Sequence, residues 1–220
     1  MSLPLQGMLI ALWLSLVFTI AEGLRRGQQD GELVRKAVHI GTGNVVPLAW
    51  GLGVPYEICL AVAGGFTTLA LMSQFVAVLP MISGVGRKTF GVFYYALSIT
   101  LLVGIFWPLG LPQFAVIGVL VMTWGDGMAA LIGKRWGRHR YMVWGNGRSL
   151  EGSLAMAVAS YGVTVAVLWP FGGWSWVVAL PVALVASVLE ASSPGGTDNL
   201  SVPLISAGLS YGLCWGLGLV

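Results

Sequence analysis

The sequence has few charged residues and few of the side chains that usually build soluble active sites. Among 220 residues only 9% are charged and two are histidine. The two cysteines, Cys59 and Cys214, lie in separate apolar runs, which excludes a disulfide framework and a thiolate metal site. Hydrophobic residues make up 57% of the chain, and the mean hydropathy is +0.86. This composition predicts a single integral membrane domain over residues 1–220.

Apolar segments that could span or enter a bilayer recur along the chain. A helix needs about 20 apolar residues to cross the hydrocarbon core. We expect an all-α polytopic bundle of about eight transmembrane helices, at Leu3–Ala21, Val38–Gly53, Ile58–Leu79, Gly91–Pro108, Gln113–Ile132, Gly152–Trp169, Trp174–Leu189 and Leu200–Val220. The second and seventh segments are short and contain glycine, proline or polar residues, so we expect partly buried or broken helices there.

Lysine and arginine are confined to alternate connections between these segments. All 11 lie within residues 22–37, 80–90 and 133–151, and the opposite connections have none. The positive-inside rule therefore predicts that the basic connections, and the polar side chains near them, face the cytoplasm. A bacterial inner membrane and a photosynthetic membrane fit this pattern equally well. Because the basic residues flank apolar segments, the net charge of +3 predicts no nucleic-acid partner.

The segment RKAVHIGTGN opens the second predicted helix with a polar stripe. Arg35 and Lys36 precede His39 by four and three residues, so the three share one helix face, which continues at Thr42 and Gly43. Such a stripe suits an anionic ligand, especially phosphate oxygens. The alternative is that Arg35 and Lys36 only anchor the helix at the membrane interface.

The segment TWGDGMAALIGKRWG places a carboxylate, Asp126, in the apolar fifth helix. An unpaired charge there is costly, so Asp126 is expected to be paired, solvated or bound to a cation. Gly125 and Gly133 predict a groove of small residues that runs from this carboxylate toward Lys134. A carboxylate and cations beside such a groove favour a Mg²⁺-phosphate site. A structural ion pair with a neighbouring arginine is the alternative.

The segment GNGRSLEG follows the most basic connection. Asn146 and Gly147 predict a turn, and Ser149 is expected to cap the next helix. Glu151 and Gly152 then lie in its first turn, where free amide groups attract anions, and Arg148 precedes them. Glu151 can equally serve only to complement the helix dipole.

The segment LEASSPGGTDN connects the last two predicted helices. Its proline and glycines predict a turn, while Glu190, Asp198 and Asn199 bring oxygen atoms to the same membrane face. An ordinary helix cap would also explain Asp198 and Asn199.

Four of these segments together resemble the membrane-bound, CTP-dependent polyprenol kinases, the group that contains phytol, farnesol and dolichol kinases. They are RKAVHIGTG, WGDGMAALIGKRWG, RSLEGSLAMA and TDNLSVPL, in order between Arg35 and Leu204, and phytol kinases are the most similar in length. The resemblance implies transfer of the terminal phosphate of CTP to the hydroxyl of an isoprenoid alcohol such as phytol or geranylgeraniol, held in membrane lipid. Arg148 departs from the family pattern, which more often has lysine there.

For this reaction we expect Mg²⁺ to be held by Asp126 with Asp198 or Glu151. The proton of the alcohol can pass to His39, Asp126 or Glu151, and the sequence does not choose among them. The residues expected to bind nucleotide or substrate are Arg35, Lys36, Asn44, Gly125, Gly133, Lys134, Arg148, Ser149, Gly152 and Asn199.

Two other functions fit parts of this pattern. Phosphatidate cytidylyltransferases are similar around Asp126 and Glu151, but their Lys-, Asp- and His-rich C-terminal signature is missing from the tail of this chain. An ion-coupled transporter would use Asp126 as its ion site, yet it predicts polar groups across the whole membrane depth, and the outer half has almost none.

Overall fold

The computed structural model describes residues 1–75, 90–172 and 175–220, and most of them are helical. The helices are α1 (Leu3–Arg26), α2 (Gly31–Gly43), α3 (Val45–Leu52), α4 (Tyr56–Met72), α5 (Gly91–Phe106), α6 (Pro112–Leu120), α7 (Gly127–Trp136), α8 (Leu150–Leu168), α9 (Ser175–Ser192) and α10 (Asp198–Gly216). A π-helical segment, Val121–Asp126, joins α6 to α7, and a short 3₁₀ turn, Trp169–Phe171, follows α8. The predicted all-α fold is confirmed, apart from one small hairpin.

Within the described residues, the predicted apolar segments overlap these helices, and residues 76–79 of the third segment and 174 of the seventh lie outside the described residues. The second is broken at Asn44 between α2 and α3, as its composition suggests, whereas the seventh forms the continuous helix α9 although it contains Pro181. Within the part of the chain that the structure describes, four helices are long and apolar enough to cross a membrane: α1, Pro112–Trp136, Leu150–Phe171 and α9. The predicted basic connection 80–90 lies almost entirely outside the described residues.

A two-stranded hairpin between α7 and α8 corrects the sequence prediction. Strands β1 (Arg140–Val143) and β2 (Asn146–Ser149) are antiparallel, and Asn146 pairs with Val143 instead of forming the turn. The turn is at Trp144 and Gly145, whose φ angles are 51° and 78°. Positive φ at both central residues matches the twist of a two-residue hairpin turn. Ser149 both ends β2 and caps α8, so the start of α8 fixes where β2 ends and thereby how it pairs with β1.

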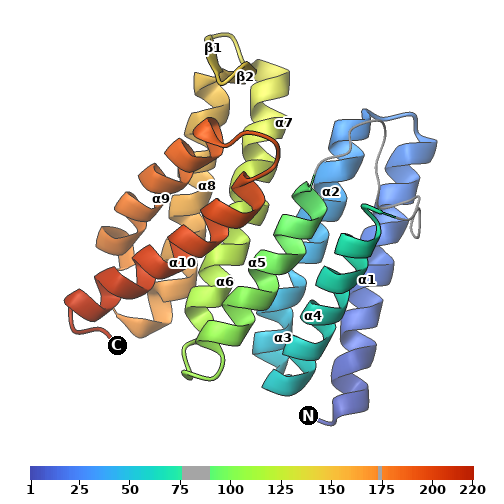
Figure 1. Cartoon of the computed structure of the whole chain (residues 1–220), viewed down its shortest axis with the longest axis vertical. Helices are drawn as coiled ribbons and strands as arrows, with labels where there is room; N and C mark the ends of the chain where they lie inside the picture. The colour runs from blue at the N-terminus through green and yellow to red at the C-terminus, as the bar shows by residue number, and fades with distance from the viewer. Residues whose placement is uncertain (76–89, 173–174) are drawn as a thin grey trace.

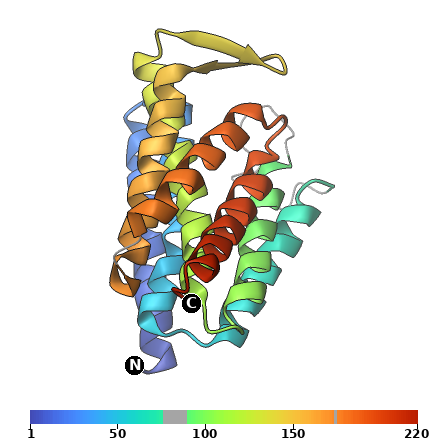
Figure 2. The ribbon, with the colours of Figure 1, turned by 90° about the vertical axis from the view of Figure 1, so that its left-hand side faces the viewer.

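The helices lie in two layers. In Figures 1 and 2, α1, α2 with α3, α6 with α7, and α8 form one layer, and α4, α5 and α10 form the other. Helix α9 contacts α8 in the first layer and α10 in the second. Both termini lie toward one end of the bundle, and the hairpin lies at the opposite end. The ends of α7 and α9 and the starts of α2 and α10 are therefore near the hairpin.

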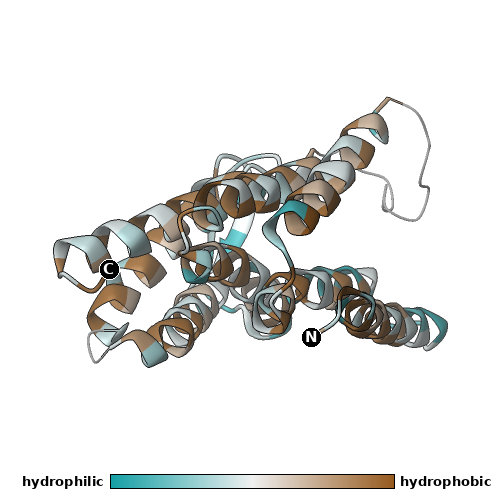
Figure 3. Ribbon diagram, turned by 90° about the horizontal axis from the view of Figure 1, so that it is seen from below, coloured by the Kyte–Doolittle hydropathy of each residue, from teal (hydrophilic) through white to brown (hydrophobic). Residues whose placement is uncertain are grey.

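The core is centred on α6 and the π-helical segment that follows it. Phe114, Ile117 and Met122 are fully buried, and 67% of the most apolar window of Pro112–Trp136 is buried, against 11% for α1. Figure 3 shows hydrophobic residues along both layers, and many of them, such as Leu12 and Phe66, are exposed. Exposed apolar side chains on long helices are expected where lipid is the solvent. The π-helical segment ends at Asp126, deep inside the bundle.

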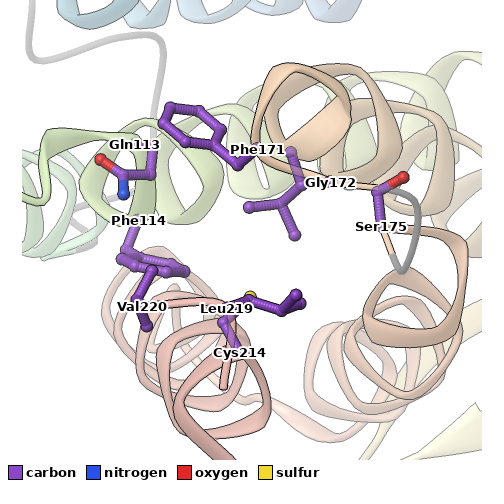
Figure 4. Close-up of a pocket in the computed structure, with 9 residues that line it drawn as sticks. Gln113, Phe114, Phe171, Gly172, Ser175, Cys214, Leu219 and Val220 are labelled. Atoms are coloured by element: carbon purple, nitrogen blue, oxygen red, sulfur yellow. The ribbon is translucent and has the colours of Figure 1, made fainter. Parts of the chain in front are cut away.

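A small cavity lies at the end of the bundle away from the hairpin. It is enclosed where the start of α6 meets the ends of α8 and α10, and Gln113, Phe114, Ser175 and Cys214 line it (Figure 4). Its volume of about 10 Å³ leaves room for one water molecule at most. None of the described residues that line it is charged.

Candidate active site

Three carboxylates from distant parts of the sequence meet inside the bundle near the hairpin end. Asp126 ends the π-helical segment, Glu190 lies in the last turn of α9, and Asp198 is the first residue of α10. One ligand atom from each lies within 4.8 Å of the others. Their exposed fractions are only 8%, 3% and 8%. Buried carboxylates do not gather without cations, so the cluster requires positive charge beside it.

Local backbone features bring the three carboxylates together. Gly195 and Gly196 have φ angles of 63° and 88°, which let the chain reverse between α9 and α10 so that Glu190 and Asp198 face each other. A Cβ on Gly196 would lie 3.0 Å from the Cα of Gly91, so this turn packs tightly on the start of α5. A π-helical turn at Asp126 is wider than an α-helical one, and such turns are frequent at functional sites.

Two basic side chains are paired with this cluster. Lys36 of α2 is 3% exposed, and its ammonium group donates a hydrogen bond to Oδ2 of Asp126. Arg148, at the end of the hairpin, forms an ion pair with Glu190, in which Nη1 lies 2.7 Å from Oε1, and donates a hydrogen bond from Nη2 to the Glu190 carbonyl oxygen at 3.1 Å. His39 lies one turn beyond Lys36, with Nε2 3.6 Å from Oδ2 of Asp126. The predicted stripe on α2 therefore reaches the carboxylate predicted on the fifth helix.

Each carboxylate of the cluster has one oxygen held by a protein donor. For Asp126 it is Oδ2, held by Lys36; for Glu190 it is Oε1, held by Arg148. Oδ1 of Asp198 accepts hydrogen bonds from the main-chain amide of Asn199 at 3.0 Å and from its side-chain amide at 3.3 Å. Among the described residues, no donor bonds the second oxygen of any of the three. Three carboxylate oxygens thus remain available for another ligand.

This arrangement fits a hard divalent cation. Magnesium binds oxygen ligands at about 2.1 Å, so that ligands on opposite sides of the ion are about 4.2 Å apart. The 4.8 Å limit within which the carboxylate atoms lie is close to that spacing, and small side-chain rotations would close the difference. No histidine or cysteine belongs to the cluster, which agrees with the oxygen preference of Mg²⁺.

Three other charged pairs near the hairpin end stay outside the cluster. Glu151, a predicted metal ligand, instead accepts hydrogen bonds from the ring and main-chain nitrogens of His139, the former at 2.7 Å. Arg35 is paired with Glu32 on its own helix, at 2.6 Å. Lys134 is paired with Asp30, and this hydrogen bond lowers the pKa of the Asp30 carboxyl. Their predicted roles at the site stay predictions.

Glu190 lies beside Asp126 and Asp198, where the sequence analysis expected Glu151 as a possible metal ligand. The sequence indicates only that Glu190 shares a membrane face with Asp198, because nothing in the spacing shows how far α9 and α10 fold back on each other. One signal was present: a glutamate at the end of an apolar helix is expensive and is usually functional.

Gly125 and Gly133, predicted to belong to a groove of small residues, lie where their segments contact α8, and Gly152 lies on the facing side of α8. A Cβ on Gly133 would lie 3.0 Å from Oγ of Ser149, and one on Gly152 would lie 2.9 Å from the carbonyl oxygen of Ala129. Gly125 faces Met156 in the same way. The Ser149 hydroxyl accepts a hydrogen bond from the amide of Gly152 at 3.1 Å, which confirms the predicted helix cap. These residues allow α7 and α8 to approach closely.

Asn44 lies at the junction of α2 and α3. Its side-chain amide donates to the carbonyl of Ile40 at 2.7 Å, and its Oδ1 lies 3.4 Å from the indole nitrogen of Trp124. Trp124 precedes Asp126 by two residues, so Asn44 contacts the π-helical segment but not the acidic cluster itself.

Tyr95 and Thr123, near His39, were not among the residues predicted for the site. The ring of Tyr95 lies 4.6 Å from the ring of His39, and the Tyr95 hydroxyl is 3.1 Å from Oγ1 of Thr123. Gly43 packs directly against Thr123 and Tyr95. Helix α5 therefore closes one side of the site, which no motif in its own sequence signals.

The fold and the site together define a class of protein before any comparison is made. It is a bundle of apolar helices that gathers carboxylates and cations at one end, the arrangement expected of an enzyme that handles a metal-bound polyanion at a membrane.

Comparison with known proteins then assigns the family. A phytol kinase of Synechocystis sp. is 49% identical over 208 residues, which cover 92% of this chain and 89% of that protein. A probable chloroplastic phytol kinase 2 of Oryza sativa subsp. japonica is 31% identical, over 88% of this chain and 70% of that protein. A chloroplastic farnesol kinase of Arabidopsis thaliana is 30% identical, over 83% and 66%. The chain belongs to the polyprenol kinase family, as its motifs predict. No family model and no solved structure matches it.

Proposed function

We propose that this protein is a kinase that transfers the terminal phosphate of CTP to the hydroxyl of an isoprenoid alcohol such as phytol or geranylgeraniol. The observation that carries the proposal is the buried cluster of Asp126, Glu190 and Asp198 with Lys36 and Arg148 beside it. It occurs in a chain that belongs to a family whose named members are phytol and farnesol kinases.

The three carboxylates are the proposed ligands of Mg²⁺. Asp126 and Asp198 keep the role that the sequence suggested, and Glu190 replaces Glu151 because it alone of the two lies in the cluster. When bound, the ion would neutralise charge on the phosphates of the nucleotide and fix their orientation.

Phosphoryl transfer needs positioning and charge neutralisation more than covalent chemistry, because negative charge is spread over the transferred group. Lys36 and Arg148 lie where they can contact phosphate oxygens next to the carboxylates. Arg35 and Lys134 lie farther out, in exposed pairs with Glu32 and Asp30, and would attract the nucleotide toward the site.

The alcohol must lose a proton as its oxygen bonds to the terminal phosphorus of CTP. At the same time the bond from that phosphorus to the bridging oxygen breaks, and CDP leaves with the electron pair. Of the three candidate proton acceptors, His39 and Asp126 lie at the cluster, whereas Glu151 is held by His139. His39 Nε2 is buried and has no hydrogen-bond partner among the described residues, so it is open to a hydroxyl group.

The apolar bundle supplies the setting for a lipid substrate. We propose that the helices cross the membrane several times with the hairpin end in the cytoplasm, as the distribution of lysine and arginine suggests. The isoprenoid tail would then stay among lipid and apolar side chains while its hydroxyl reaches the cluster. Nucleotide would arrive from the water on the hairpin side.

The choice of CTP follows from the motif resemblance and has a direct test. Purified protein is incubated with Mg²⁺, with labelled CTP, ATP or UTP, and with phytol, geranylgeraniol, farnesol, dolichol, diacylglycerol or phosphatidate. The proposal expects a phosphorylated prenol, formed with CTP and lost when the metal is chelated. Formation of a CDP-lipid would replace it with a cytidylyltransferase, and ion-dependent uptake into vesicles without either product would replace it with transport.

A further inference from the structure

The five side chains at the centre of the site do not balance in charge. Asp126, Glu190 and Asp198 carry three negative charges when ionised, and Lys36 and Arg148 carry two positive ones. Arg35, on the same helix as Lys36, is paired with Glu32, so this pair adds no net charge. With all five groups ionised, they carry one net negative charge before any ligand binds, and that charge repels a polyphosphate.

A divalent ion on the free carboxylate oxygens reverses that sign. It adds two positive charges, so that the same five side chains and the ion together carry one net positive charge. Inside a bundle of low dielectric constant such a reversal acts strongly on a nearby anion. Once the metal neutralises the carboxylates, Lys36 and Arg148 are no longer needed for that purpose.

Both cations have the capacity to accept new partners. The ammonium group of Lys36 has three donors, and among the described residues it donates one hydrogen bond, to Asp126. The guanidinium group of Arg148 uses Nη1 and Nη2 on Glu190, while its Nε is buried without a partner among the described residues. Arg148 is also the more exposed of the two, with 27% of its side chain accessible.

We propose that Lys36 and Arg148 are exchangeable counterions: they neutralise the metal-binding carboxylates while the site is empty and bind the polyphosphate once the metal is present. The inference rests on the proposed function and deepens it, because it makes the binding of metal and polyphosphate mutually dependent. Lys36 and Arg148 each weaken binding of the metal alone, and both strengthen binding of the polyphosphate once the metal is bound.

A purely positioning role makes the opposite prediction for the metal. If Lys36 served only to hold Oδ2 of Asp126 so that Oδ1 points at the ion, its removal would loosen the carboxylate and weaken metal binding. If Lys36 is an exchangeable counterion, its removal strengthens binding of the metal alone and weakens binding of the polyphosphate. The two measurements therefore move in opposite directions only under the present proposal.

The test uses purified full-length protein, Mn²⁺ and inorganic tripolyphosphate. Binding of Mn²⁺ alone is followed by the loss of the free-ion electron paramagnetic resonance signal, and binding of labelled tripolyphosphate by equilibrium dialysis with and without Mn²⁺. For the unaltered protein, we expect tripolyphosphate to bind at least about 10-fold more tightly with Mn²⁺ present. For Lys36→Met, we expect Mn²⁺ alone to bind about 10-fold more tightly and tripolyphosphate with Mn²⁺ about 10-fold more weakly.

Arg148→Met provides a second variant with the same expected signs, and Arg26→Met is the matched control. Arg26 also sits in an ion pair, with Glu22, but on α1 and 78% exposed, so neither measurement should change. Weaker Mn²⁺ binding by Lys36→Met and Arg148→Met would overturn the proposal, and so would metal-independent tripolyphosphate binding by the unaltered protein. Because neither probe is a nucleotide or an alcohol, failure here leaves the kinase assay unaffected. Conversely, a wrong nucleotide or acceptor leaves this result standing.

Discussion

Two sets of ion pairs lie near the same end of the bundle, and they differ in burial. One set converges on a single cluster with side chains that are mostly buried, as in Lys36 and Asp126, which are 4% and 11% exposed. The other set is dispersed over the surface, as in Lys134 and Asp30, which are 57% and 45% exposed. The first set contains Lys36–Asp126 and Arg148–Glu190, and the second contains Arg35–Glu32, Lys134–Asp30 and His139–Glu151.

The difference in burial indicates which charged side chains are expected to have a functional role. Exposed pairs contribute little to stability, and solvent and salt screen them. Buried charges have lost their water and are often less stabilising than apolar residues of the same size. The bundle nevertheless brings three carboxylates and two cations together from α2, the π-helical segment, the hairpin, α9 and α10. We therefore expect these buried charges to serve binding or catalysis.

The largest expected effect comes from Asp126→Asn. The amide keeps the shape of the side chain but removes the charge that faces Lys36 and the proposed metal. We expect prenol phosphorylation to fall by at least about 10²–10³-fold, since preorganised charge supplies much of the rate in such sites. The measurement is turnover of purified variant whose recovery from the membrane fraction matches that of the unaltered protein. Unchanged turnover would remove Asp126 from the mechanism.

The next effect separates the two glutamates that the sequence presented as candidates. Glu190→Gln should lower kcat/KM by about 100-fold or more, because it removes a carboxylate from the cluster. Glu151→Gln should change kcat/KM by less than about 5-fold, because Glu151 is bonded to His139 away from the cluster.

Both glutamate variants are assayed over a range of Mg²⁺ concentrations. Excess Mg²⁺ should partly restore Glu190→Gln and leave Glu151→Gln unchanged. If Glu151→Gln were instead the variant that responds to Mg²⁺, the metal would belong with Glu151, and the buried set would lose its special status.

The sequence predicts this fold well because lipid imposes a simple rule. Backbone groups in a bilayer must bond within a helix, so apolar length alone locates α1, α4, α5 and α8. The break at Asn44 was also visible, because Thr42, Gly43 and Asn44 interrupt an apolar run. The hairpin was missed because its strands are only four residues each, and the Asn-Gly pair pointed to a turn two residues too late.

The sequence predicted which segments contribute to the candidate site, but not which side chains contact one another there. The motifs located Lys36, Asp126, Arg148 and Asp198, since charged residues in apolar surroundings stand out. They did not show that Arg148 would reach α9 and bond Glu190, or that Tyr95 of α5 would lie against His39. Those contacts depend on how helices pack across the two layers, which periodicity within one helix cannot specify.

Glycines with and without close neighbours test how tightly the helices near the site pack. Gly152→Ala should destabilise the protein by about 1–3 kcal/mol, because the added Cβ would lie 2.9 Å from the carbonyl oxygen of Ala129 and force α7 and α8 apart. Gly208→Ala is the matched control on α10, where a Cβ meets nothing within 4 Å, and it should be neutral or stabilising by about 0.5–1 kcal/mol. Thermal unfolding in detergent measures both. Equal shifts in the two variants would show that the contact between α7 and α8 is not tight.

The smallest effect is expected from the exposed set, at Asp30→Asn. Asparagine also caps a helix, so the variant keeps the start of α2 and loses mainly the ion pair with Lys134. Turnover should stay within about twofold of the unaltered protein. The pKa of Asp30 is lowered by Lys134, so any stability that this pair adds is present near neutral pH and lost as the pH falls through that lowered pKa. Thermal unfolding of the two proteins should therefore converge in acid. A large loss of turnover would place Asp30 and Lys134 with the buried set and erase the distinction between the two.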